Sequence, residues 1–147
     1  MPRGRALYGP LPAQLNDPNS FARRLSAILA VRARHGIATA TQLDIAAVSD
    51  PAMLVMVHAL EHGLQVTALN FSSTTVIGAA VSDHLTVGSS VTDMLTNAQL
   101  PDVDEGHTLR LNLQPHQGLS LLVAADGGSN TGSAATETHQ QHRRLQP

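Results

Sequence analysis

Cysteine, lysine and tryptophan are absent from this sequence of 147 residues, and aromatic side chains make up only 2% of it. Without cysteine there is no disulfide, no thiolate metal site and no cysteine nucleophile. The aromatic residues are Tyr8, Phe21 and Phe71, so a hydrophobic core has to be built from Leu, Val and Ile. The length predicts about one domain and excludes an eight-stranded α/β barrel, which needs about 250 residues.

Charged residues are also few, at 14% of the sequence, and the formal net charge is −2. The nine positively charged side chains are all arginine. They create no basic field, so nucleic-acid binding is not expected. Apolar runs such as Met53–Val57 are too short to cross a membrane, which takes about 20 residues. The basic start, Met1–Arg5, is not followed by the apolar stretch of a secretory signal, so a cytoplasmic location is expected.

The first 40 residues carry the signals of one amphipathic helix. Asn16 or Asp17 can cap its start, and Pro18 suits its first position because proline has no N–H to leave unsatisfied there. Gly36 is placed where a left-handed residue ends a helix. The apolar side chains that follow the proline recur on one helical face, namely at Phe21, Leu25, Ile28 and Leu29.

From residue 41 to residue 125 the pattern predicts a mainly β domain. Short β-branched runs alternate with turn residues and have no helices between them, which indicates an antiparallel β-sandwich. The segment Val87–Leu100 is left open between a short helix and a further strand. Residues 126–147 are rich in Gly, Ser and Thr and are expected to be a disordered tail. The expected strands are Gln42–Val48, Met53–Leu60, Leu64–Phe71, Thr75–Val81, His107–Leu113 and Leu119–Ala124.

One short motif points to metal chemistry. His58, Glu61 and His62 match the H-x-x-E-H pattern of inverted zinc metallopeptidases, in which both imidazoles bind zinc and the glutamate is the general base. That reading needs a helix and a third ligand, for which Asp102 or Glu105 is available. The alternative interpretation is a hairpin of two strands that turns at Glu61–Gly63, on which the two histidines would not converge.

Three other groups are weaker candidates for a site. Asp102, Asp104 and Glu105 cluster after Pro101, but a glycosidase needs two carboxylates held across a cleft. His139 and His142 lie in the tail, where a solvated role is expected. The triplet of residues 70–72 matches a glycosylation sequon and is interpreted as the end of a strand.

The order of the segments resembles the C-terminal part of trehalose synthase, a maltose α-D-glucosyltransferase family of the α-amylase superfamily. The resemblance covers about residues 7–124. The segments similar to the end of the catalytic barrel are Leu7–Leu15, Asp17–Leu25 and Ile28–Gln42. The segments similar to the C-terminal β-sandwich are Leu54–His58, Val66–Ser72, Val91–Thr96 and Leu109–Val123.

The resemblance implies a Greek-key sandwich of the α-amylase C-terminal type and three parts. Residues 1–40 would be the last barrel helix and its lead-in, residues 41–125 the sandwich domain, and residues 126–147 the tail. The family's catalytic acids lie on barrel strands that match no residue here. No catalytic, cofactor-binding or metal-binding residue is therefore assigned.

The function that the resemblance implies is a non-catalytic sandwich fragment of an enzyme that converts maltose to trehalose. Such a fragment would be inactive by itself and would support the catalytic barrel, its expected partner. Self-association through the exposed helix face is expected in the absence of that barrel. Two alternatives stay open: a small zinc hydrolase that uses His58, Glu61 and His62, and an independent α-glucan-binding module. The scarcity of aromatic platforms argues against the latter.

Overall fold

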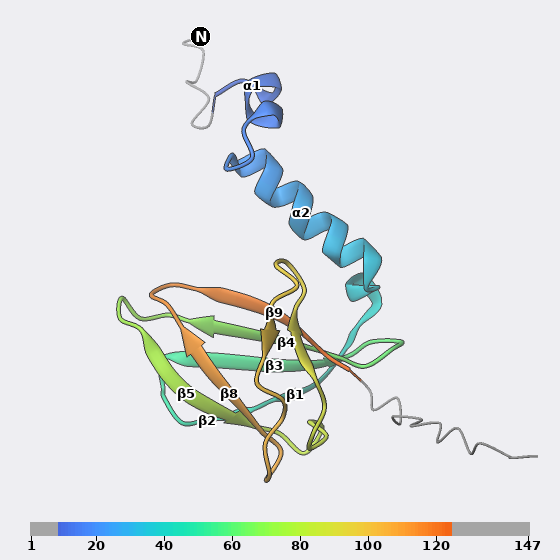
Figure 1. The fold of residues 1–147 in the computed structure, drawn as a ribbon, viewed down its shortest axis with the longest axis vertical. Helices are drawn as coiled ribbons and strands as arrows, with labels where there is room; N and C mark the ends of the chain where they lie inside the picture. The colour runs from blue at the N-terminus through green and yellow to red at the C-terminus, as the bar shows by residue number, and fades with distance from the viewer. Residues whose placement is uncertain (1–8, 125–147) are drawn as a thin grey trace, which may run out of the picture.

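The computed structural model describes residues 9–124, and within them the helices precede the strands (Figure 1). Helix α1 (Leu11–Asn16) and helix α2 (Phe21–Arg34) are followed by a short 3-10 helix, η1 (Ile37–Thr39). Nine strands follow in this part of the chain. They are β1 (Thr41–Ile45), β2 (Ala47–Val48), β3 (Met53–Ala59), β4 (Leu64–Asn70), β5 (Val76–Val81), β6 (Val91–Asp93), β7 (Gln99–Leu100), β8 (Thr108–Leu113) and β9 (Gly118–Val123).

The strands form two sheets that pack face to face, with β5 and β8 lying across β3 and β4 in Figure 1. Sheet A has six strands in the order β1-β3-β4-β9-β6-β7, and sheet B has three in the order β2-β5-β8. Every strand pair is antiparallel. The predicted fold class, a mainly β antiparallel sandwich preceded by an amphipathic helix, is confirmed for residues 9–124.

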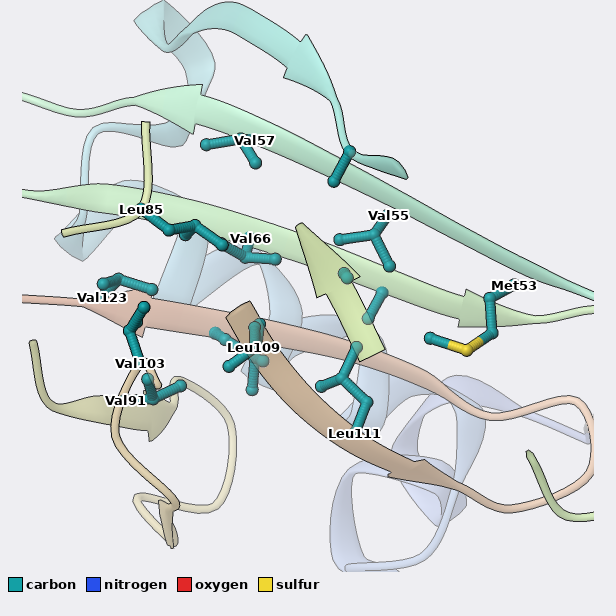
Figure 2. Packing of buried hydrophobic residues seen from close by; sticks show 14 of the residues in the cluster. Met53, Val55, Val57, Val66, Leu85, Val91, Val103, Leu109, Leu111 and Val123 are labelled. Carbon is teal, nitrogen blue, oxygen red and sulfur yellow. The ribbon is translucent and has the colours of Figure 1, made fainter. Parts of the chain in front are cut away.

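The core between the sheets is aliphatic, as the composition requires. Successive side chains of a strand point to opposite faces, so β3 buries Met53, Val55 and Val57 while the residues between them face outward. Strands β4, β8 and β9 alternate in the same way. The buried cluster in Figure 2 also includes Val66, Leu85, Val91, Val103, Leu109, Leu111 and Val123.

The helical region differs from its prediction at the start and agrees at the end. Helix α2 begins at Phe21, and its cap is Ser20, whose Oγ accepts a hydrogen bond from the N–H of Arg23 at 3.2 Å. Asp17 instead accepts from the N–H of Asn19 in the preceding turn, and the separate helix α1 was not foreseen. Gly36 has φ 63°, which confirms the predicted left-handed position after the helix.

The expected strand Gln42–Val48 is two strands that belong to different sheets. The register of β1 against β3 shifts between Gln42 and Asp44, and the chain then crosses so that β2 pairs with β5. Ala46 lies at this crossing and is buried. A bulge of this kind bends a strand, which lets one continuous β-branched run serve both layers.

The segment Val87–Leu100, for which the sequence allowed either a short helix or a further strand, contains two short strands. Val91 is buried on β6, and Met94 lies just after that strand. The carboxylate of Asp93 accepts hydrogen bonds from the N–H of Leu95 and the Oγ1 of Thr96, both at 2.8 Å. These bonds close a turn that leads into β7.

The predicted tail, residues 126–147, lies outside the described residues, and the division at residues 40 and 41 stays a prediction. Among residues 9–124, no helix has the length and apolar character that a membrane-spanning segment requires.

Leu121→Ala tests the aliphatic core. Leu121 is fully buried on β9, and its truncation leaves a cavity that costs about 2–5 kcal/mol of unfolding free energy. Urea unfolding monitored by circular dichroism measures the loss. Ile77→Ala is the control, because Ile77 is 80% exposed on β5 and its truncation should change stability by less than about 0.5 kcal/mol. Equal effects of the two substitutions would contradict the assigned core.

Candidate functional site

The H-x-x-E-H motif does not lie on a helix. His58 is on β3, whereas Glu61 and His62 are in the turn between β3 and β4. The Glu61 and His62 side chains are about 90% exposed, and the His62 Nε2 lies 3.7 Å from the Glu61 carboxylate. The alternative interpretation from the sequence, two strands joined by a turn at Glu61–Gly63, is therefore confirmed.

His58 lies within strand β3, whereas the other two motif residues lie in the turn that follows. It lies in register with Gln42 on β1 and Gln65 on β4, and its Nδ1 is buried without a hydrogen-bond partner in the described structure. Within residues 9–124, no three His, Asp or Glu side chains come close enough to hold a metal ion. The zinc hydrolase alternative is wrong, because an extended strand rises about 3.3 Å per residue and so separates residues four apart that a helix would bring together on one turn.

The acidic cluster also fails to form a pair across a cleft. Asp104 forms an ion pair with Arg110 on β8 and a β-bridge with Thr108, while Asp102 and Glu105 are exposed on the same loop. The contacts of Asp104 with Arg110 and Thr108 hold the loop to the edge of sheet B. His139 and His142 lie outside the described residues.

The sequon asparagine is a structural residue. Asn70 ends β4 and is only 3% exposed. Its Nδ2 lies 2.8, 3.2 and 2.9 Å from the carbonyl oxygens of Thr74, Leu113 and Gln114, respectively. Its Oδ1 accepts from both the N–H and the Oγ of Ser72 at 2.8 Å. The amide thus ties the loop after β4 to the end of β8, and it is too buried to accept a glycan.

Helix α2 carries a stripe of exposed apolar side chains. Leu25, Ile28 and Leu29 are 41%, 50% and 54% exposed, and the extensive contacts of α2 are with α1 and η1 rather than with a strand. The helix leads away from the sandwich in Figure 1. Leu25, Ile28 and Leu29 of the apolar stripe predicted from the sequence are thus exposed among residues 9–124.

The charges on α2 have one sign. The helix carries four arginines and no acidic residue. Arg23 donates from Nε to the carbonyl oxygen of Leu15 at 2.6 Å and so fastens α1 to α2. Arg32 and Arg34 lie in the last turn, where positive charge is favourable beside the helix carbonyl groups. Arg24 and Arg32 border the apolar stripe by helical spacing.

A polar pocket lies where α2 meets the sandwich. It has a volume of about 570 Å³ and is lined on one side by Arg34 and His35 and on the other by Glu61 and His62. These side chains differ in charge, and three of the four belong to the exposed surface. We therefore interpret the pocket as the junction of helix and sandwich and not as a ligand site.

No family model matches the sequence, and no curated protein matches it. Similar solved structures include a β-L-arabinopyranosidase of glycoside hydrolase family 27 from Geobacillus stearothermophilus, at 20% identity and a TM-score of 0.47. A candidate α-N-acetylgalactosaminidase from Bacillus halodurans has 12% identity and a TM-score of 0.47. Each match covers 60% of this chain, which spans 20% and 21% of those two proteins, respectively.

The predicted membership of the trehalose synthase family is wrong by these comparisons. The similar structures belong to glycoside hydrolase family 27 or carry an α-N-acetylgalactosaminidase assignment, and neither a family model nor a curated relative supports the α-amylase superfamily. The function inferred from that family, a fragment of an enzyme that converts maltose to trehalose, is therefore wrong as well. The zinc hydrolase and glucan-binding alternatives find no support either. The low identities and TM-scores do not bring a glycosidase activity to this chain. One helix followed by short aliphatic strands specifies a sandwich, whereas many unrelated families share such a fold.

Asn70→Asp tests the structural role of the sequon asparagine. The substitution keeps the side-chain shape but replaces a donor with a carboxylate that faces carbonyl oxygens, so we expect a loss of about 3 kcal/mol or more in unfolding free energy. Asn112→Asp is the matched control on an exposed position of β8, where the expected change is below about 0.5 kcal/mol. Urea unfolding measures both, and similar values would refute the assigned role.

Proposed function

We propose that this chain is a protein-binding domain in which the sandwich presents helix α2 to another folded domain. The observation that carries the proposal is the exposed stripe of Leu25, Ile28 and Leu29. A 14-residue helix is marginal in water unless its apolar face packs against something. The stripe is therefore interpreted as one half of an interface.

The charge of α2 indicates the chemistry of the partner. With four arginines and no acid on the helix, the complementary surface is an apolar groove edged by Asp or Glu side chains. An amphipathic helix in an apolar groove is a common mode of recognition, with anchors three and four residues apart. Two copies of α2 packed together would instead place arginine near arginine, which is unfavourable.

Two expectations from the sequence stay predictions beside this proposal. The α-amylase-type barrel as the partner is one, and self-association through the helix face is the other. The cytoplasmic location is likewise a prediction. The proposal itself needs only a partner with an apolar and acidic surface.

A photo-crosslinking amino acid placed in α2 identifies the partner. The full chain carries it either at Ile28, within the stripe, or at Ala30, about half a turn away on the helix. Both positions are exposed, so they form a matched pair. We expect Ile28 to crosslink one discrete protein in cells of the source organism and Ala30 to crosslink it weakly. Equal crosslinking from both positions would contradict the proposal.

Binding to the purified partner then measures the contribution of the stripe. The double substitution Leu25→Ser and Ile28→Ser removes about 2 kcal/mol of apolar burial and should weaken binding about 30-fold. Ile77→Ser, on the exposed face of β5, is the control and should leave the affinity unchanged. The affinity should also fall as salt rises, because arginines face carboxylates.

A third measurement separates a protein partner from a membrane surface. Basic amphipathic helices also bind anionic lipids. Co-sedimentation with phosphatidylglycerol vesicles that is lost in the double variant would overturn the protein partner, and absence of co-sedimentation supports it.

A further inference from the structure

The outward face of sheet A is a second surface with an unusual composition. Strand alternation and the register of the sheet place one set of side chains on the side away from sheet B. The set consists of Gln42, Ile45, Leu54, Met56, His58, Gln65, Thr67, Leu69, Thr92, Gln99, Gly118, Ser120 and Leu122. None of these residues is Asp, Glu, Lys or Arg.

Sheet B does not share this property. Its outward face carries Arg110, which pairs with Asp104. Charged residues usually make up about a quarter to a third of a solvent-facing surface. They are depleted at the centre of a protein interface. The outward face of sheet A therefore has the composition of an interface.

One half of this face is apolar and contiguous. Leu54 pairs with Leu69 across β3 and β4, and Met56 pairs with Ile45 across β3 and β1. Phe71 continues the row after β4, since its N–H donates to the carbonyl oxygen of Ala52. Ile45 and Phe71 are 59% and 65% exposed. We call these residues the sheet A patch: Ile45, Leu54, Met56, Leu69 and Phe71.

The other half is polar, and several of its side chains hydrogen-bond to one another within the face, although the buried Nδ1 of His58 has no partner in the described structure. Gln65 is 7% exposed, and its Nε2 donates to Thr67 Oγ1 at 3.2 Å and to Ser120 Oγ at 3.0 Å. Thr92 and Gln99 bond each other at the edge of the sheet. Covering the Gln65 Nε2 group and the Thr92–Gln99 pair costs little, because these groups are already hydrogen-bonded within the face.

We propose that the outward face of sheet A binds a second copy of this chain. A neutral face laid on an identical neutral face buries no unpaired charge, whereas a strongly acidic or basic partner would leave its charges desolvated. A two-fold axis through the sheet A patch brings the patch of one copy onto that of the other, which is the usual symmetry of a homodimer.

The size of the face agrees with a weak dimer. The six strands of sheet A hold 30 residues, which at about 3.3 Å per residue and about 4.8 Å between strands present roughly 480 Å² per copy. The total of about 950 Å² lies in the range of weak, transient interfaces. The interface is separate from helix α2, so the dimer does not depend on the partner proposed for that helix.

Sedimentation equilibrium of the full chain tests the dimer. We expect a monomer–dimer equilibrium in the micromolar range, and Ile45→Glu or Phe71→Glu should each weaken it at least about tenfold by placing a carboxylate in the interface. Both positions are exposed, so the monomer should keep its fold. Phe71→Ser is a milder second variant with the same expected direction, and circular dichroism checks each monomer.

Ile77→Glu is the matched control, since it makes the same change on the outward face of sheet B and should leave the equilibrium within about threefold of the original. The dimer should also persist in 1 M NaCl, because no charge pair holds it. A monomer at all concentrations up to about 300 µM would overturn the proposal. So would dissociation by Ile77→Glu to the same extent, or dissociation only by Leu25→Ser with Ile28→Ser, which would move the contact to α2.

Discussion

The aliphatic layer between the two sheets is the constraint on which the rest of this structure depends. With almost no aromatic side chains, the layer is closed by Val and Leu at alternate positions of β3, β4, β8 and β9. Because alternation has a period of two, the choice of inward residues also determines which residues face outward. The positions of His58, Gln65 and Ile77 follow from this one condition.

The same constraint explains why the chemical motifs of the sequence do not assemble. A strand that buries Val55 and Val57 has to turn His58 outward, and the turn that follows leaves Glu61 and His62 in solvent. Asn70 faces inward, and its side chain forms hydrogen bonds that link the end of β4 to the end of β8. What remains available to other molecules is surface: the stripe of α2 and the outward face of sheet A.

Much of the fold could be predicted because local signals agreed with burial. Residues with a strong backbone preference marked several boundaries. Examples are the ends of β3 and β4, the turn at Glu61–Gly63 and the left-handed Gly36. The sequence does not predict helix α1, because this helix has only six residues and ends shortly before the cap of α2 at Ser20. Strand β7 was missed because two residues carry no periodicity.

The candidate surfaces could be predicted only in part. The stripe on α2 was visible as a helical period, since its residues are close in sequence. The neutral face of sheet A was not, because its members come from six strands whose order, β1-β3-β4-β9-β6-β7, does not follow the chain. The family was assigned wrongly because segment order constrains an architecture far more than it identifies a lineage.

The sequence by itself determined the class of the fold, the aliphatic nature of the core and the position of helix α2, because periodicity and turn residues act over a few neighbours. Only the tertiary structure decided that residues 42–48 serve two sheets, that β9 lies between β4 and β6, and which uncharged side chains share one face. Those features depend on pairing between segments far apart in the chain. No local preference encodes which distant strand will satisfy the backbone hydrogen bonds of another.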